Sequence, residues 1–325
     1  MRLLSFLLAL LPLPAWAEDI LLSGPPIWES APLIALAETQ PVEGVTFIFR
    51  PWASPEELRK MLMAKVPLIA VAPSPTAAVF DAGRIGAGRI GADGIGAGRI
   101  GADGIGADGI GLRVVSATVT EGSLSIVGRG GPVADLAELR GASLALPFKG
   151  HLPDLMMRRI APPGAESWQP YYTGSLNAGV QLLLAGQVDN ALLTEPLATL
   201  ALAQDPGLSR RAGLCGLWRE ATALASCPPA GVVLVNPAFG NRREVLSAYR
   251  AAFATLAADP GAAAPLLARH FPEMERAREG FARINALDLA MPENAALLAD
   301  FYAAIMEVEP DAIGGRLPGP DFYGP

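Results

Sequence analysis

Short apolar runs alternate with helical patterns along most of the chain. The run from Val66 to Ala72 is apolar throughout and ends at Pro73. The stretch before it opens a helix, because Ser54 has the character of an N-cap, Pro55 suits the first helical position and Glu57 completes a capping box. Strands that are apolar on both faces and alternate with helices are typical of parallel sheets covered by helices.

This alternation occurs in two sets, and the chain returns to the first set near residue 230. We therefore predict an α/β fold of two lobes, each a mainly parallel sheet flanked by helices. Lobe I is expected to contain residues 18–112 and 230–325, and lobe II residues 113–229. A chain of 325 residues is long enough to give each lobe its own core.

The first seventeen residues, MRLLSFLLALLPLPAWA, have the pattern of a cleaved signal peptide. Arg2 supplies the positive start, Leu3 to Leu13 form the apolar stretch, and Ala15-Trp16-Ala17 gives the small-x-small cleavage pattern. Two prolines and the short apolar length disfavour a buried helix or a membrane span. The pattern predicts export, and with it a soluble, monomeric protein in the periplasm.

The overall charge argues against a nucleic-acid partner. The formal net charge is −7 and charged residues make up only 18% of the chain. Such a surface would be repelled by a phosphate backbone. No second stretch of about 18 apolar residues follows the leader, so the sequence predicts no membrane span after it.

The chain has only two cysteines, Cys215 and Cys227. In an oxidising compartment an even pair this close in sequence usually forms a disulfide. Two free thiols or a metal-binding pair are the alternatives. The metal interpretation has little support in the sequence, because no histidine or second cysteine pair lies nearby.

Residues 85–111 form a five-residue repeat, IGAGR-IGADG and its copies. Repeats of this period can build a β-solenoid, but each unit here carries two or three glycines and few apolar groups. We interpret the segment as an expanded loop between a helix at 75–82 and a strand from Leu112. Such a helix-to-strand loop lies at the end of a sheet opposite the ligand-facing loops.

Ligands of parallel α/β sheets bind beyond the carboxyl ends of the strands. That rule selects the loops at 23–28, 72–76, 147–151, 171–175 and 194–196. The third is the most distinctive, since LALPFKGHLPDLM places an aromatic ring, a cation and an imidazole in one turn before a helix. The predicted ligand-contacting residues are Ser23, Trp28, Ser74, Thr76, Phe148, Lys149, Gly150, His151, Tyr171, Tyr172, Thr194 and Glu195.

Structural roles compete with each of these assignments. Lys149 can be a solvated surface residue, and His151 can cap the helix that follows. Glu195 can be a helix-start carboxylate bound to nearby amides. Serines at strand ends can be helix caps, and aromatic residues there can simply pack the lobe. The sign of a ligand also stays open, because Lys149 favours a negative group whereas Asp154 and Glu195 favour an amphoteric or nitrogen-rich one.

At residues 135–197 the chain resembles the periplasmic solute-binding proteins of ABC importers, in the nitrate, sulfonate and taurine branch that includes binders of thiamine precursors. The motifs are DLAELRG before a strand, and AGQVDNALLTEP later; PPAGVVLVN at 228–236 is similar to the strand that returns to the first lobe. The matching residues are Asp135, Leu136, Leu139, Arg140, Gly141, Leu183, Gly186, Val188, Asp189, Asn190, Glu195 and Pro196.

This resemblance implies a type II two-lobed receptor that closes over a small molecule and delivers it to a membrane permease, with no cofactor. The alternatives on the same fold are a lyase-like periplasmic enzyme and a ligand-sensing subunit. The sequence offers no catalytic set in support: it contains no G-x-S-x-G, no metal-spaced histidine cluster and no phosphate loop.

Overall fold

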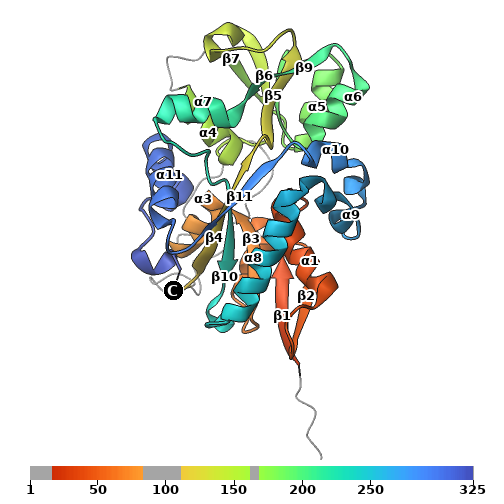
Figure 1. The fold of residues 1–325 in the computed structure, drawn as a ribbon. Helices are drawn as coiled ribbons and strands as arrows, with labels where there is room; N and C mark the ends of the chain where they lie inside the picture. Colours follow the sequence, from red (N-terminus) through yellow and green to blue (C-terminus); the bar gives the residue numbers. More distant parts are fainter. Residues whose placement is uncertain (1–16, 83–110, 162–167, 325) are drawn as a thin grey trace, which may run out of the picture.

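The computed structural model describes residues 17–82, 111–161 and 168–324. The predicted signal peptide and the predicted repeat loop therefore lie outside the described residues, apart from their last positions. Figure 1 shows two α/β lobes, one above the other, with the chain passing between them near the centre.

The first lobe is built on a six-stranded sheet with strand order β11-β4-β10-β3-β1-β2. β1 is parallel to β2 and β3, whereas β10 runs antiparallel to β3 and β4, and β11 antiparallel to β4. The sheet is therefore mixed, not mainly parallel as predicted. The strands are β1 (Glu18–Ser23), β2 (Val45–Phe49), β3 (Leu68–Pro73), β4 (Arg113–Glu121), β10 (Gly231–Val235) and β11 (Asn285–Ala290).

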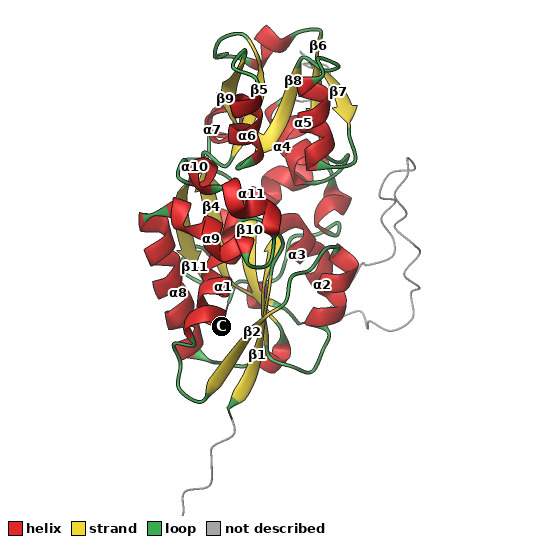
Figure 2. Ribbon diagram, turned by 90° about the vertical axis from the view of Figure 1, so that its right-hand side faces the viewer, coloured by secondary structure: helices red, strands yellow, loops and turns green. Residues whose placement is uncertain are grey.

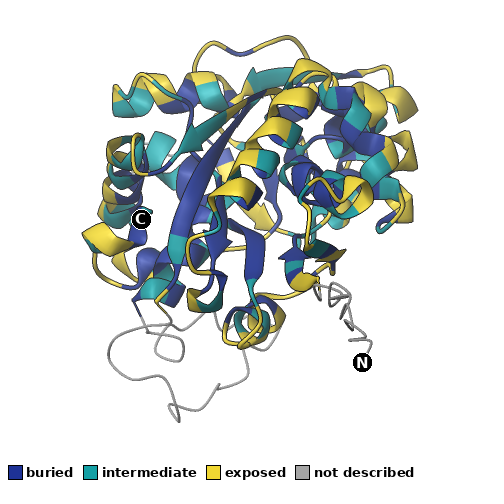
Figure 3. Ribbon diagram, turned by 60° about the horizontal axis from the view of Figure 1, so that its bottom comes forward, coloured by how far each residue is buried: buried dark blue, intermediate teal, exposed yellow. Residues whose placement is uncertain are grey.

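Helices cover both faces of this sheet, which explains the uninterrupted apolar run in β3. Ile69 and Val71 join the core with α1, α8 and α9, while Leu68, Ala70 and Ala72 join the core with α2, α3 and α11. Figure 3 shows these dark-blue strands running between more exposed helices. The helices are α1 (Ala31–Thr39), α2 (Pro55–Leu62), α3 (Ser74–Asp81), α8 (Arg243–Ala258), α9 (Ala263–Ala268), α10 (Arg278–Phe281) and α11 (Ala295–Val308).

The second lobe has a five-stranded sheet with order β7-β6-β8-β5-β9. β6 is parallel to β7 and β8, and β5 is antiparallel to β8 and β9, so this sheet is mixed too. The elements are β5 (Leu124–Arg129), β6 (Ala142–Leu146), α4 (Leu152–Ile160), β7 (Trp168–Tyr172), α5 (Leu176–Leu184), β8 (Asn190–Thr194), α6 (Leu197–Gln204), β9 (Leu208–Gly213) and α7 (Leu214–Thr222).

Short 3-10 helices join several of these elements. They lie at Trp28–Ser30, Leu136–Leu139, Pro237–Phe239, Pro260–Ala262, Pro272–Arg276, Pro310–Ile313 and Pro320–Phe322. Within the described part of the chain, no helix alone has the length and hydropathy that a membrane span requires. Arg243–Ala258 and Pro260–Ala268 meet that requirement only when counted together, and they are bent by 113°.

The crossing between the lobes differs from the predicted boundary. β4 was expected to start lobe II, but its nine residues pair with β10 and β11 in the first sheet. The chain crosses at residues 122–123, directly after β4, and returns through residues 223–230 before β10. The sequence could not show this, because one apolar strand can join either sheet until its neighbours are known.

The carboxyl ends of the central strands in both sheets face these crossings. After β3, the Ser74 N–H donates to the Ala230 carbonyl at 3.0 Å. After β8, the Glu195 N–H donates to the Ser123 carbonyl at 2.7 Å. Strands parallel to β3 or to β8 end on the same side, so the loops after β1, β2, β6 and β7 also emerge at the lobe boundary. In Figure 2, the arrowhead of β7 points toward the first lobe.

The lobes also contact each other away from the crossings. Trp218 of α7 packs 5.5 Å from Phe301 of α11, measured between ring centroids. On the same side, Arg158 of α4 lies 3.5 Å from Glu309, and Arg159 lies 3.2 Å from Glu307. One hydrophobic cluster thus contains side chains of both lobes.

The two cysteines form a disulfide, as predicted, with their Cα atoms 4.9 Å apart. Cys215 lies on α7, in the second lobe, and Cys227 lies in the segment that returns to the first lobe. The bond therefore ties the last helix of the second lobe to the second crossing.

Deleting residues 86–110 is expected to leave folding and ligand affinity almost unchanged. The flanking elements α3 and β4 meet this segment at Asp81 and Arg113, and Arg113 pairs with Val235 at the end of β10 remote from the crossings. We expect a change in the free energy of unfolding within about 0.5 kcal/mol, as for other surface changes. Denaturant unfolding and ligand titration of the deletion variant measure it; an unfolded variant would mean that the repeat is a packed solenoid.

Candidate functional site

The turn at residues 147–151 joins the carboxyl end of β6 to α4, at the lobe boundary. Gly150 has φ +73°, a conformation that favours glycine over residues with a side chain. Its N–H donates to Asp154 Oδ2 at 2.7 Å. Asp154 is fully buried in the first turn of α4, so this one carboxylate fixes the shape of the turn.

Asp154 also positions the neighbouring strand end. The Tyr172 hydroxyl donates to Asp154 Oδ1 at 2.9 Å, while Arg158 lies 3.9 Å from Oδ2. Burial, with the Asp154 charge adding to it, raises the pKa of Tyr172, so its phenol keeps its proton. Asp154 was not among the predicted site residues. Its position three residues after His151 did indicate a carboxylate in the first turn of the helix that follows the turn.

The side chains around the turn form two contacting pairs. The Lys149 ammonium lies 5.9 Å from the centre of the Tyr172 ring, within reach of a cation–π attraction. The Phe148 and His151 rings lie 5.0 Å apart. Phe148 is 36%, Tyr171 51% and Tyr172 37% exposed, so three aromatic rings and one ammonium present a surface to solvent.

His151 is better suited to hydrogen bonding than to charge attraction. Partial burial lowers its pKa, and the Asp154 charge only partly opposes this effect. The imidazole is therefore neutral at neutral pH, with one nitrogen donating and the other accepting. His151 is the N-cap residue of α4, but its side chain makes no capping hydrogen bond. Lys149 is then the cation of this turn.

Three predicted contact residues have internal partners instead. Ser23 is buried and donates to the Arg50 carbonyl at 2.6 Å. Trp28 is 2% exposed, donates to the Pro260 carbonyl at 3.0 Å and packs edge-on against Phe253. Ser74 is buried, and its hydroxyl donates to the Pro229 carbonyl. We therefore leave these side chains out of the proposed contact set.

Glu195 has an internal partner as well. Arg210 of β9 donates two hydrogen bonds to Glu195 Oε1, at 2.5 and 3.2 Å, and the Thr199 N–H donates to Oε2 at 3.2 Å. The carboxylate is completely buried. Glu195 thus has the structural role given above as the alternative to ligand binding: its carboxylate accepts from an amide at the start of a helix. It also forms an ion pair with Arg210. The remaining predicted residues, Thr76 and Thr194, are partly exposed after β3 and at the end of β8.

A hydroxyl chain at the first crossing was not predicted. The Ser123 hydroxyl donates to Thr120 Oγ1 at 3.0 Å, and Thr120 donates to Glu29 Oε1 at 3.0 Å. Burial is the main cause that raises the pKa of Glu29, while hydrogen bonds oppose it. The sequence around Glu29 carries no signal for this contact. The contact joins the loop after β1 to β4, and these segments are far apart in sequence.

Replacing Glu29 by glutamine is expected to reduce the loss of stability that occurs as the pH rises. A carboxyl whose folded pKa is raised favours the folded state when protonated, so its contribution is lost as pH rises through that folded pKa. Glutamine still accepts from Thr120 but carries no charge. Denaturant unfolding of both proteins over a series of pH values from acidic to alkaline measures the difference. The exposed Glu43→Gln variant, which should follow the unmodified protein, is the control.

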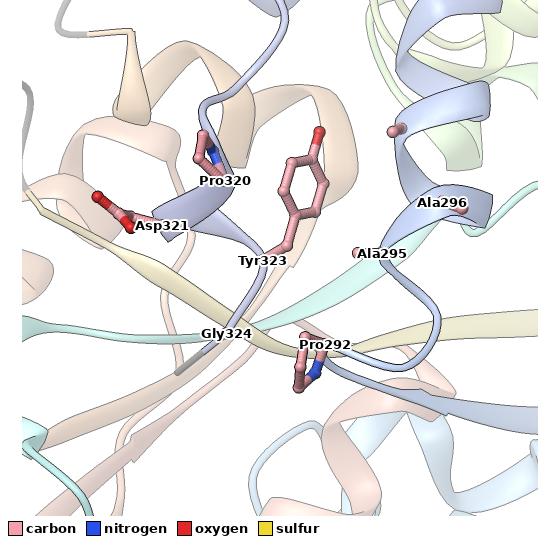
Figure 4. A pocket seen from close by; sticks show the side chains of 8 residues that line it. Pro292, Ala295, Ala296, Pro320, Asp321, Tyr323 and Gly324 are labelled. Carbon is pink, nitrogen blue, oxygen red and sulfur yellow. The ribbon is translucent and has the colours of Figure 1, made fainter.

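A cavity in the described structure lies elsewhere, between the start of α11 and the C-terminal segment (Figure 4). It has a volume of about 560 Å³ and contains none of the predicted site residues. Its walls are mainly alanine and proline side chains with Tyr323, and its acidic group is Asp321. No converging set of donors from several elements lines it, so we do not assign the ligand site there.

Two mixed sheets flanked by helices, joined by two crossings, define the two-lobed fold of periplasmic binding proteins. Comparison with solved structures gives the same class. An ABC transporter protein from Parabacteroides distasonis matches with a TM-score of 0.72 at 20% identity, covering 95% of this chain and 99% of that one. The two-lobed α/β fold predicted from the sequence is thereby confirmed, although both sheets are mixed and not mainly parallel.

Two sulfonate-binding proteins are similar in the same way. The periplasmic aliphatic sulphonate binding protein SsuA from Escherichia coli matches with a TM-score of 0.66 at 14% identity, covering 95% of this chain and 92% of that one. A putative periplasmic sulfonate-binding protein from Methylobacillus flagellatus matches with a TM-score of 0.60 at 11% identity and the same coverage. No protein-family model and no curated protein sequence matches this chain.

Proposed function

We propose that this protein is an exported receptor of an ABC importer, which captures a small molecule between its lobes and delivers it to a permease in the inner membrane. Lobe I contains the sheet of β1 to β4, β10 and β11, and lobe II the sheet of β5 to β9. Two of the similar structures are sulfonate-binding proteins, one of them of an ABC transporter, and this supports a binding role over catalysis. Export rests on the leader pattern in residues 1–17.

One observation carries the proposal of where the ligand binds. The carboxyl ends of the parallel strands in both sheets meet at the lobe boundary, and four exposed side chains, those of Phe148, Lys149, Tyr171 and Tyr172, lie at or just after the ends of β6 and β7. Ligands of open α/β sheets bind outside these strand ends. The proposed contact set is Thr76, Phe148, Lys149, Gly150, His151, Tyr171, Tyr172 and Thr194.

This set suits a small molecule with one anionic or accepting group and one flat part. Lys149 supplies the charge attraction, while the free N–H or ring nitrogen of His151 supplies a hydrogen bond. The rings of Phe148, Tyr171 and Tyr172 supply a surface for stacking. Asp154 holds both ends of this surface in place through Gly150 and Tyr172.

A thermal-shift screen of sulfonates, nitrate, bicarbonate, pyrimidines and small amines would identify the ligand, because binding to the folded state raises its stability. For a ligand found in this way, Lys149→Ala is expected to weaken binding at least tenfold, or about 1.4 kcal/mol. Isothermal titration measures the change. Lys65→Ala, an exposed lysine after α2, is the matched control and should bind normally.

Unchanged affinity in Lys149→Ala would remove that side chain from the site. Conversion of the ligand into a product would contradict the proposed receptor function. A receptor returns its ligand unaltered and binds it at one per chain, whereas an enzyme releases a changed product. Incubating the protein with its ligand and analysing the released molecule by mass spectrometry separates the two functions.

A further inference from the structure

The disulfide lies beside a carboxylate at the place where the chain crosses between lobes. Glu121 is the last residue of β4, Cys215 lies in the first turn of α7, and Cys227 lies in the return segment. Cys215 Sγ is 3.7 Å from Glu121 Oε1, and the two sulfurs and a carboxylate oxygen all lie within 4.8 Å of one another. Three segments that are distant in sequence thus bring three metal-ligating side chains together.

Two thiolates and one carboxylate are a ligand set that binds zinc-like ions, with water completing a tetrahedral site. We propose that this disulfide is the oxidised form of a metal site, and that the reduced protein binds one thiophilic divalent cation through Cys215, Cys227 and Glu121. The metal interpretation had little support in the sequence, because no histidine or second cysteine pair lies near either cysteine along the chain. The fold supplies a third ligand from β4.

The surroundings of the three residues favour the change between the disulfide form and the metal-bound form. Arg219, one helical turn after Cys215, lies 3.7 Å from Glu121 Oε1, and Asn285 Nδ2 lies 3.5 Å from Oε2. The Arg219 side chain is 46% exposed, so it can turn to solvent when a cation takes its place. Cys215 is partly exposed, which gives a reductant access, whereas Cys227 is buried.

The chemistry balances with a dithiol as the reductant. The dithiol donates two electrons and two protons, so that the sulfur–sulfur bond breaks into two cysteine thiols while the reductant closes its own disulfide. A divalent cation then displaces the two thiol protons and binds the two thiolates and the Glu121 carboxylate. A disulfide oxidant reverses the sequence: it accepts two electrons and takes up two protons from solvent to become a dithiol, while the Cys215–Cys227 bond forms again and the cation is released.

Both states hold the same segments together. The disulfide joins α7 to the return segment, and the metal would join these two and the end of β4, so it would connect both crossings. Reduction without metal removes the covalent tie. We therefore expect the reduced metal-free protein to be the least stable of the three forms, and metal to raise the stability of the reduced form alone.

The test uses the full mature chain, reduced with dithiothreitol, freed of reductant and titrated anaerobically with Co²⁺ as a spectroscopic probe. We expect one Co²⁺ per chain, an intense near-ultraviolet thiolate-to-cobalt absorption and displacement by Zn²⁺. The oxidised protein should give no such band. Zn²⁺ should raise the melting temperature of the reduced protein and leave that of the oxidised protein unchanged.

Variants separate the site from adventitious binding. The double variant Cys215→Ser with Cys227→Ser should lose the absorption band completely, and Glu121→Gln should weaken Co²⁺ binding at least tenfold. Glu220→Gln, an exposed carboxylate on the same helix, is the matched control and should bind as the unmodified protein does. The proposal is overturned if the reduced protein gives no thiolate band, if Glu121→Gln binds Co²⁺ normally, or if circular dichroism shows that reduction unfolds the chain.

Discussion

Glu195→Ala is expected to destabilise the protein by about 3–5 kcal/mol, because it leaves the buried end of Arg210 without its partner. Arg210 Nη2 lies 2.5 Å from the Glu195 carboxylate, whose side chain has no exposed surface, and it also donates to Thr199 Oγ1 at 2.6 Å. Truncation also removes the acceptor of the Thr199 N–H. The free energy of unfolding from denaturant titration measures the loss.

A double-mutant cycle with Arg210→Ala tests the cause. If the ion pair accounts for the effect, the double variant should be more stable than the sum of the two single losses predicts. The ligand affinity of folded Glu195→Ala should change little. A variant with normal stability and lost ligand binding would instead return Glu195 to the contact set.

Glu195 has a further contact that limits its movement. A Cβ at Gly280 of α10 would lie 2.8 Å from Glu195 Oε2 and 2.8 Å from Pro196 Cα. The first lobe therefore packs against the start of α6 so closely that only glycine fits at position 280. This contact helps to explain why Glu195 is inaccessible, and it depends on a helix more than eighty residues later in the chain.

Asp154→Ala should have the second large effect, a loss of both stability and ligand affinity. The substitution removes the acceptor of the Gly150 N–H and of the Tyr172 hydroxyl, and each unsatisfied donor costs about 1–3 kcal/mol. We expect the free energy of unfolding to fall by about 2–4 kcal/mol if Gly150 and Tyr172 recover part of their hydrogen bonding with water. Ligand affinity should fall at least as far as in Lys149→Ala, because the whole turn loses its shape.

Two milder variants distinguish positioning from fold loss. Asp154→Asn keeps one accepting oxygen, so it should recover part of the stability and part of the affinity. Tyr172→Phe keeps the ring under Lys149 but loses the hydroxyl that anchors it, so its unfolding free energy should fall by about 1 kcal/mol. If folded Asp154→Ala, studied below its melting temperature, bound ligand normally, the 147–151 turn would not belong to the site.

Much of the fold followed from local patterns. The apolar run from Val66 to Ala72 occurs as β3, the helix expected at 75–82 occurs as α3, and the Ser54 cap with Pro55 starts α2 as predicted. β9 and β11 were missed for a shared reason. LSRRAG and NALDLA carry charged residues and little β-branched character, so only pairing with β5 and β4 makes them strands.

For the candidate site, the sequence predicted which turn lies at a strand end better than it predicted the partners of individual side chains. Residues 147–151 do emerge at a strand end facing the lobe boundary, and Cys215 and Cys227 do form a disulfide. Residue type suggested ligand roles for Trp28 and Glu195, but distant segments supply Pro260 and Arg210 as their partners.

The sequence by itself determined the α/β architecture, the presence of two sheets and the turn between β6 and α4, because each depends on the pattern of neighbouring residues. Only the tertiary structure decided which sheet receives β4, that Asp154 holds Tyr172, that Arg210 neutralises Glu195 and that Glu121 lies against the disulfide. These four facts join segments between 15 and more than 90 residues apart. Local propensity cannot specify such contacts, because they depend on how the sheets close around a shared boundary.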